Sequence, residues 1–266
     1  MLEASDGRVP AILLFGGTDS AGCAGLAMDL RTCAALGVHG ACVVTAVTAQ
    51  STREVAGLHS VPAEFVALQA ETVGRDLEPR AIKTGMLANA EIIAAVARYC
   101  ETERPEIVVV DPVLVSTTGG VLLEKKALAL LNERLFPAAS LITPNVPEAA
   151  LLLGRPLATL GDLHGAAREL RERGAKAVLL KGGHLDVTQA IDVLHWEGGE
   201  LELEAPRLDV ANTRGTGCAL ATAITASLLR GLELDKAVAF AKDWLLGAIS
   251  AGYAVGKGPG PIDPLG

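Results

Sequence analysis

The chain has few aromatic residues, no cluster of positive charge and no recognisable cysteine pairing. Aromatic side chains make up 3% of its 266 residues, and its formal net charge is −8. Surfaces that bind nucleic acids need clustered lysine and arginine, often with aromatic stacking platforms. The composition therefore predicts no nucleic-acid partner, and an anionic ligand would need a local binding site.

The cysteines and the apolar runs exclude several other classes of protein. The five cysteines, an odd number without Cys-x-x-Cys spacing, are Cys23, Cys33, Cys42, Cys100 and Cys218. Neither a disulfide framework nor a zinc site is indicated, so a reducing cytoplasm is the expected location. The apolar stretch 218–229 is too short to cross a bilayer, and charged residues precede the short apolar run near the N-terminus. We expect a cytoplasmic chain without a membrane partner.

Short β-branched runs alternate with amphipathic helical patterns, as in stacked βαβ units. The clearest strands are expected at 11–15, 41–46, 107–110, 141–143 and 177–180, and helices at 25–36, 63–73, 90–100, 125–135 and 160–173. Two later runs, 191–196 and 201–205, flank a glycine-rich turn and predict an antiparallel edge. Hydrophobic residues make up half of the chain and no linker is visible. One α/β domain over residues 1–266 is therefore expected, with a mostly parallel central sheet covered by helices on both faces.

Polar residues stand at the ends of several predicted strands. A glycine-rich turn at 16–19 follows the first strand, and Asp111, Asn145, Glu148 and Lys181 follow three later ones. In an open parallel sheet these ends share one edge, where ligands bind. The two carboxylates suit a hydrated Mg²⁺ beside phosphate oxygens, and the lysine could reach a phosphate past two glycines. Helix capping by the acidic residues and a surface position for the lysine are the alternatives.

The segment Gly-Thr-Gly-Cys at 215–218 stands where a strand-like stretch ends and an alanine-rich helical pattern begins. Backbone N–H groups at a helix start bind anions, and the helix dipole favours negative charge there. In this setting the pKa of Cys218 is expected to be lowered, which would bring a basic sulfur to a phosphoryl group. The segment thus predicts phosphoryl transfer, with an ordinary helix start and a packed cysteine as the alternative.

Two further polar residues are candidates for ligand binding. Asp29 falls within the apolar arc of the predicted helix 25–36 and needs a partner there, either a substrate or a neighbouring loop that it caps. Gln50 lies just past a strand and offers a donor and an acceptor to a heteroaromatic ring, although a surface turn is equally compatible. His39 and His184 show no metal-ligand spacing and are interpreted as structural.

Seven motifs occur in the order found in the hydroxymethylpyrimidine/phosphomethylpyrimidine kinases of thiamine biosynthesis, members of the ribokinase-like superfamily. They are Gly-Thr-Asp-Ser-Ala-Gly-x-Ala-Gly at 17–25, Thr-Ala-x-Thr-Ala-Gln at 45–50, Thr-Gly-Met-Leu at 84–87, Asp-Pro-Val at 111–113, Thr-Pro-Asn-x-Pro-Glu-Ala at 143–149, Lys-Gly-Gly-His at 181–184 and Gly-Thr-Gly-Cys at 215–218. The chain resembles this family from about residue 11 to residue 261.

The resemblance implies a ribokinase-like three-layer αβα sandwich that uses ATP and Mg²⁺. The implied reactions are phosphorylation of 4-amino-5-hydroxymethyl-2-methylpyrimidine and then of its monophosphate. The implied pyrimidine pocket comprises Gly17, Asp29, Gln50, Met86 and Val113, and the implied cofactor contacts are Lys181, Asn145, Thr213 and Thr216. By the same resemblance, Asp111 and Glu148 organise Mg²⁺, Cys218 takes the hydroxymethyl proton, and the backbone from Gly215 through Gly217 to Cys218 forms the anion hole.

Three residues depart from the usual family pattern. Cys23 stands in the first loop, Met28 precedes Asp29, and Arg214 precedes the Gly-Thr-Gly-Cys segment. Cys23 could narrow the pocket, while Arg214 either adds a cation near the phosphate path or contacts solvent. Pyrimidine specificity is therefore open to two alternatives, a pyridoxal or pyridoxine kinase of the same superfamily and a non-catalytic pyrimidine-binding protein. A homodimer is expected, and the segment 39–61 is interpreted as a flap over the pocket or as a dimer surface.

Overall fold

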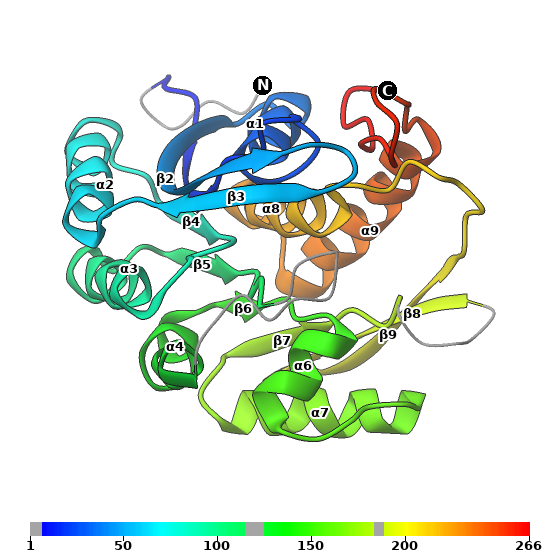
Figure 1. Cartoon of the computed structure of the whole chain (residues 1–266). Coiled ribbons are helices and arrows are strands. Elements are labelled where there is room, and N and C mark those ends of the chain that lie inside the picture. The colour runs from blue at the N-terminus through cyan, green and yellow to red at the C-terminus, as the bar shows by residue number, and fades with distance from the viewer. Residues whose placement is uncertain (1–6, 115–124, 184–188) are drawn as a thin grey trace.

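The computed structural model describes residues 7–114, 125–183 and 189–266, and it arranges them in three layers with one sheet between two sets of helices (Figure 1). The strands are β1 (Ala11–Gly17), β2 (His39–Gln50), β3 (Val55–Ser60), β4 (Ala81–Thr84), β5 (Ile107–Val110), β6 (Leu141–Ile142), β7 (Ala177–Leu180), β8 (Gln189–Trp196) and β9 (Gly199–Pro206). They form a nine-stranded sheet in the order β3-β2-β1-β4-β5-β6-β7-β8-β9. The six strands from β2 to β7 in this order run parallel, while β3 at one edge and β8 and β9 at the other are antiparallel to their neighbours. The mostly parallel sheet predicted from the sequence is confirmed.

Helices cover both faces of the sheet because successive side chains of a strand point to opposite faces. Leu13 and Phe15 of β1 belong to one buried cluster, and Ile12 and Leu14 belong to the other. The helices of the first cluster are α2 (Ala63–Leu77), α3 (Ala90–Glu103), α4 (Lys125–Leu130), a π-helical turn η1 (Leu131–Leu135), α5 (Phe136–Ala138), α6 (Val146–Leu153) and α7 (Leu160–Glu172). The helices of the second cluster are α1 (Gly25–Ala35), α8 (Thr216–Leu229) and α9 (Leu234–Ser250).

Helix α8 is the most enclosed of the helices on the second face. It packs on β4 and β5 and contacts both α1 and α9, and most of its side chains are buried (Figure 1). Its alanine-rich sequence suits this place because small side chains let three helices and a sheet approach one another closely. The start of α8 is thereby held against the carboxyl ends of the parallel strands.

The elements predicted from the sequence are present, with differences in extent. The strand expected at 41–46 continues to Gln50 and pairs with β3, so the segment 39–61 forms the antiparallel edge of the sheet. The segment 125–135 is helical but changes from α to π geometry at Leu131. The hairpin of β8 and β9 confirms the predicted antiparallel edge. Strand β4 was not predicted, because a lysine interrupts its short apolar run. His184 lies outside the described residues.

Candidate active site

The carboxyl ends of β5, β6 and β7 bring three polar side chains together. The Thr143 hydroxyl donates to Asp111 Oδ1 at 2.9 Å, and Lys181 Nζ donates to the same oxygen at 2.8 Å. Asn145 and Lys181 also form a parallel β-bridge just beyond the strands. The convergence of strand-end polar residues predicted from the sequence is confirmed.

The Asp111–Lys181 pair is held in its ionised form. Burial would raise the pKa of Asp111, but Lys181 and Lys83 outweigh it, so the pKa of this carboxyl lies below its usual range. Burial would lower the pKa of Lys181, but Asp111 and Glu148 hold it above its usual value. The edge of the sheet therefore carries a fixed ammonium group at neutral pH.

The first turn of α8 lies directly against this ion pair. A Cβ atom built on Gly217 would lie 3.6 Å from Lys181 Nζ and 3.7 Å from Asp111 Oδ2. Gly215, the N-cap residue, has φ +87°, and a Cβ there would lie 2.5 Å from the carbonyl oxygen of Cys23 and 2.8 Å from Met28 Cε. Among the described residues no side chain caps this helix. The N–H groups of its first turn, which have no partner within the helix, are therefore available to an anion beside a lysine.

Cys218 sits in this first turn and is partly exposed. Burial raises the pKa of its thiol to about 11; Lys83 and the backbone N–H of Gly25 lower it, whereas Asp29 and Asp111 raise it further. The predicted lowering of the thiol pKa is wrong, because desolvation and two carboxylates outweigh the nearby cations. Cys218 lies at the start of α8, as predicted, and also packs against the second buried cluster, while its contact with a phosphoryl group stays a prediction.

Asp29 has the buried partner that its place in the apolar arc requires. Lys83 Nζ donates to both of its carboxylate oxygens at 2.9 Å, and the Thr222 hydroxyl donates to Oδ1 at 2.8 Å. Asp29 is 1% exposed and Lys83 is fully buried. Asp29 is thus paired with a strand and a helix and not with the neighbouring loop that the sequence offered as an alternative, and a substrate contact by Asp29 stays a prediction. The sequence reasoning missed both partners, although a single lysine inside the apolar run of β4 was a signal for one of them.

Comparison with known proteins identifies the family. The sequence model of the family described as phosphomethylpyrimidine kinase matches residues 19–263. The chain belongs to this family. It is 45% identical over 256 residues to the hydroxymethylpyrimidine/phosphomethylpyrimidine kinase of Rhizobium meliloti, with 94% of this chain and 95% of that relative covered. It is 43% identical over 255 residues to the thiamine biosynthesis bifunctional protein ThiED of Geobacter sulfurreducens, with 96% of this chain and 52% of the relative covered, so the chain spans about half the length of that protein.

A solved structure confirms the fold. The pyridoxal kinase from Staphylococcus aureus in complex with AMP-PCP and pyridoxal superposes with a TM-score of 0.90 at 30% sequence identity, covering 97% of this chain and 94% of that chain. The resemblance inferred from seven motifs and the ribokinase-like α/β fold are therefore both confirmed. No helix within residues 7–114, 125–183 and 189–266 is long and apolar enough to cross a membrane.

Four more residues belong to the pyrimidine pocket that the resemblance implies. They lie at the ends of four neighbouring strands. Gly17 ends β1, Gln50 ends β2, Met86 follows β4 and Val113 follows β5. A Cβ on Gly17 would lie 2.3 Å from Met86 Cε, so these two residues are in close contact. Val113 lines a small cavity with Asp111 and residues 84 and 85. The structure thus brings the four residues to one edge, while their contacts with a pyrimidine stay predictions.

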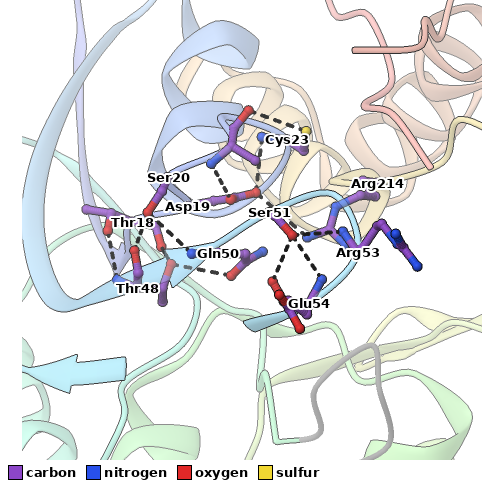
Figure 2. A network of polar contacts seen from close by, with 11 residues as sticks. Thr18, Asp19, Ser20, Cys23, Thr48, Gln50, Ser51, Arg53, Glu54 and Arg214 are labelled. Carbon is purple, nitrogen blue, oxygen red and sulfur yellow. Dashed lines mark hydrogen bonds and ion pairs between the residues drawn. The ribbon is translucent and has the colours of Figure 1, made fainter. Parts of the chain in front are cut away.

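The loop after β1 is folded around Asp19, whose side chain accepts hydrogen bonds from the backbone N–H groups of Ala21 at 2.9 Å and Cys23 at 3.1 Å (Figure 2). Arg214 reaches the same carboxylate, with Nη2 3.8 Å from Oδ2, and its side chain is only 15% exposed. Burial and Asp19 raise the pKa of the Cys23 thiol, against a lowering by Arg214. Arg214 therefore packs beside an acidic loop rather than in open solvent, and Gln50 lies close by, beside Thr48 (Figure 2).

Asn145 and Glu148 form a capping box at the start of α6. Asn145 Oδ1 accepts from the Glu148 N–H at 2.9 Å, and Glu148 Oε2 accepts from the Asn145 N–H at 2.8 Å. Burial raises the pKa of Glu148 to about 7. The helix-capping alternative is thus confirmed for Glu148, whereas Asp111 bonds to Thr143 and Lys181 instead. The contacts of Asn145 and Glu148 with nucleotide or metal stay predictions, as do those of Thr213, which is exposed, and Thr216, which is partly exposed.

Proposed function

We propose that this chain is an ATP-dependent kinase that phosphorylates 4-amino-5-hydroxymethyl-2-methylpyrimidine and then its monophosphate to the diphosphate. The observation that carries the proposal is the meeting of the Lys181–Asp111 pair with the first turn of α8, which contains Cys218. A fixed ammonium, the N–H groups of a helix start and a thiol lie within one small region. Phosphoryl transfer asks a protein mainly for such charge stabilisation and positioning.

In the proposed reaction the hydroxymethyl oxygen attacks the γ-phosphorus of ATP, and its proton passes to the thiolate of Cys218, which becomes a neutral thiol. A bond forms between this oxygen and the γ-phosphorus, and the bond from the γ-phosphorus to the bridging oxygen breaks, so that ADP leaves with the electron pair. The N–H groups of the first turn of α8 and the Lys181 ammonium stabilise the charge on the transferred group. General-base help of this kind contributes about 10²- to 10⁴-fold to the rate.

The donor set at the sheet edge fits Mg²⁺ that is shared with phosphates. Within the described residues no three His, Cys, Asp or Glu side chains are grouped closely enough to hold a metal ion by themselves. Asp111 and Glu148 offer two carboxylates, and Mg²⁺ commonly takes one or two carboxylates together with substrate phosphates and water. Magnesium would neutralise negative charge on the nucleotide, and Asp111 and Glu148 are the residues proposed to hold it.

A pyridoxal kinase activity is the second candidate. The observation in its favour is the close structural match to the Staphylococcus aureus pyridoxal kinase, with a TM-score of 0.90. The identity to that enzyme is 30%, whereas the identity to the Rhizobium meliloti pyrimidine kinase is 45%. The higher identity supports the pyrimidine alcohol as the proposed substrate.

The test is to follow products by mass spectrometry with MgATP and, in separate reactions, the pyrimidine alcohol, its monophosphate and pyridoxal. Diphosphate formed from both pyrimidines, with pyridoxal turned over far more slowly, is the expected result. Faster turnover of pyridoxal than of either pyrimidine would replace the substrate assignment. Tight pyrimidine binding without ATP consumption would show a non-catalytic binding protein.

We also propose that one domain spans residues 1–266 and that the chain forms a homodimer in the cytoplasm. The single sheet, which contains strands from β1 to β9, supports one domain. The edge strand β3 and its partner β2 expose Val47, Val55 and Leu58, which supports a contact between two copies through this edge. Light scattering that shows a monomer at micromolar concentration would overturn the dimer.

A further inference from the structure

A buried cation lies beneath the start of α8. Lys83 of β4 is fully buried, and its ammonium donates to both oxygens of Asp29 on α1 at 2.9 Å. Thr222 of α8 donates to the same carboxylate at 2.8 Å. One ion pair thus joins the sheet to two helices. Isolated burial of either ion would cost several kcal/mol, so the pair requires this close geometry.

The position of this pair relates it to the thiol rather than to the rest of the core. Thr222 follows Cys218 by four residues in α8, so the two side chains lie on the same face of the helix, one turn apart. Ala81, two residues before Lys83 in β4, belongs to the buried cluster shared with α1 and α8, so Lys83 points to that side of the sheet as well. The ammonium is therefore enclosed between β4 and the helix that carries Cys218.

The charges around the thiol show what the ammonium does there. The groups that act on Cys218 are Lys83 from β4, Asp29 and the Gly25 N–H from α1, Asp111 beyond β5 and Lys181 beyond β7. Burial would lower the pKa of Lys83, but Asp29, Cys218 and Asp111 together raise it, so the group stays charged. Two lysines thus oppose two carboxylates next to one thiol, and removing Lys83 would leave an excess of negative charge.

We propose that Lys83 is a positioning residue of the kinase reaction, whose ammonium, fixed by Asp29 and Thr222, supplies the positive charge that stabilises the Cys218 thiolate. The inference rests on the proposed function, in which Cys218 accepts the hydroxymethyl proton. With a thiol pKa of about 11, only about one thiol in 10⁴ is ionised at pH 7. Loss of the cation would reduce this small fraction further, because an opposite charge close to a group typically shifts its pKa by about 1 to 3 units.

The experiment measures the rate of iodoacetamide alkylation of Cys218 against pH, with each cysteine resolved by peptide mass spectrometry. In Lys83→Met we expect alkylation of Cys218 at pH 8 to slow by about tenfold or more, and its pH profile to move upward. Lys83→Arg keeps the charge and should alkylate within a few-fold of the wild-type rate. In parallel, kcat for the pyrimidine alcohol should fall in Lys83→Met with little change in KM, and Lys83→Arg should recover much of it.

Lys242→Met is the matched control, because Lys242 is also a buried lysine paired with an aspartate, Asp192 at 2.7 Å, but belongs to α9. It should lose stability and leave the alkylation rate of Cys218 unchanged. A wild-type alkylation rate in a folded Lys83→Met protein, or equal slowing in Lys242→Met, would overturn the proposal. Wild-type kcat in Lys83→Met despite slower alkylation would overturn the role in the reaction.

A second variant keeps the proposal testable if Lys83→Met does not fold. Asp29→Asn combined with Lys83→Met removes both buried charges, and it should still alkylate more slowly than wild type, because Lys83 acts on the thiol more strongly than Asp29 does. An unchanged rate in this double variant would also overturn the proposal. Alkylation needs no substrate, so it tests the charge effect separately from the proposed function. If the wild-type protein phosphorylated none of the alcohols, the proposed function would be wrong whatever the alkylation rates show.

Discussion

Among the buried lysine–aspartate pairs of the described residues, Lys83–Asp29 and Lys242–Asp192 differ in their surroundings. In the first, Lys83 donates to both oxygens of Asp29, next to the thiol of Cys218. In the second, Lys242 donates to Asp192 at 2.7 Å and also to the backbone carbonyl oxygens of Ala190 and Leu203. The second lysine therefore bonds largely to the main chain and holds α9 against the β8–β9 hairpin, whereas the first places its charge near the thiol of Cys218.

The second pair contacts the backbone next to the site. Asp192 Oδ1 accepts from the N–H of Gly182 at 2.9 Å, and Gly182 follows Lys181 directly. A Cβ on Gly182 would lie 1.9 Å from the carbonyl oxygen of Ile191, so only glycine fits this contact between the strand end and β8. The comparison teaches that a buried ion pair supports a site in two ways, by holding the main chain in place or by setting the charge near a side chain.

The largest expected effect comes from removing the thiol of Cys218, whose thiolate the first pair is proposed to stabilise. Cys218→Ala should lower kcat for the pyrimidine alcohol by about 10²- to 10⁴-fold, the usual contribution of a general base, while substrate binding changes little. Steady-state kinetics and calorimetric titration with the pyrimidine measure the two quantities. Cys33→Ala, at a buried cysteine of α1, is the control and should keep kcat. A Cys218→Ala enzyme with wild-type kcat would break the link between the first pair and the chemistry.

The sequence predicted the site better in position than in electrostatics. The strand-end rule placed Asp111 and Lys181 together, and the Gly-Thr-Gly-Cys segment placed a helix start beside them, because both follow from local pattern and the geometry of parallel sheets. The pKa of Cys218 was predicted in the wrong direction, because burial of the thiol and the carboxylates of Asp29 and Asp111 raise it by more than Lys83 lowers it, and these surroundings are set by packing between segments far apart along the chain. The apolar arc predicted that Asp29 needs a partner but could not name Lys83, because a pairing across 54 residues is decided by packing.

The second prediction concerns the pair that fastens α9. Lys242→Met leaves Asp192 as a buried carboxylate without its cation and should lower the free energy of unfolding by about 3 to 5 kcal/mol. Urea denaturation followed by circular dichroism measures the change. Lys236→Met, on the exposed side of the same helix, should change stability by no more than about 0.5 kcal/mol. Equal stability of the two variants would show that Lys242 does not fasten α9.

Glu148 is a buried carboxylate without a directly bonded lysine among the described residues, and it tests how much that lysine matters. Burial raises the pKa of Glu148 from about 4.5 to about 7, so the folded chain holds this proton more tightly than the unfolded chain does. The stability that Glu148 contributes is therefore fully present below about pH 4.5 and is lost as the pH rises to about 7. Relative to Glu148→Gln, which does not titrate, the wild type should lose about 3 kcal/mol between pH 4.5 and pH 8. An equal difference at both pH values in urea denaturation would contradict the raised pKa.

The smallest expected effect comes from comparing two buried threonines of α8, one bonded to the first pair and the other bonded to its own helix. Thr222 and Thr225 are both fully buried in α8, but the Thr222 hydroxyl donates to the Asp29 carboxylate, whereas that of Thr225 donates to the carbonyl oxygen of Ala221 in its own helix. Hydrogen bonds to charged groups contribute about 1 kcal/mol more than neutral ones, so Thr222→Val should be less stable than Thr225→Val by about 1 kcal/mol in urea denaturation. Thr222→Val should also alter the alkylation rate of Cys218, because the carboxylate that orients Lys83 loses one of its three hydrogen bonds. If the two valine variants were equally stable and were alkylated at the same rate, the hydrogen bond from Thr222 would not help to position the pair. Asp29 and Lys83 would then position each other without a contribution from α8.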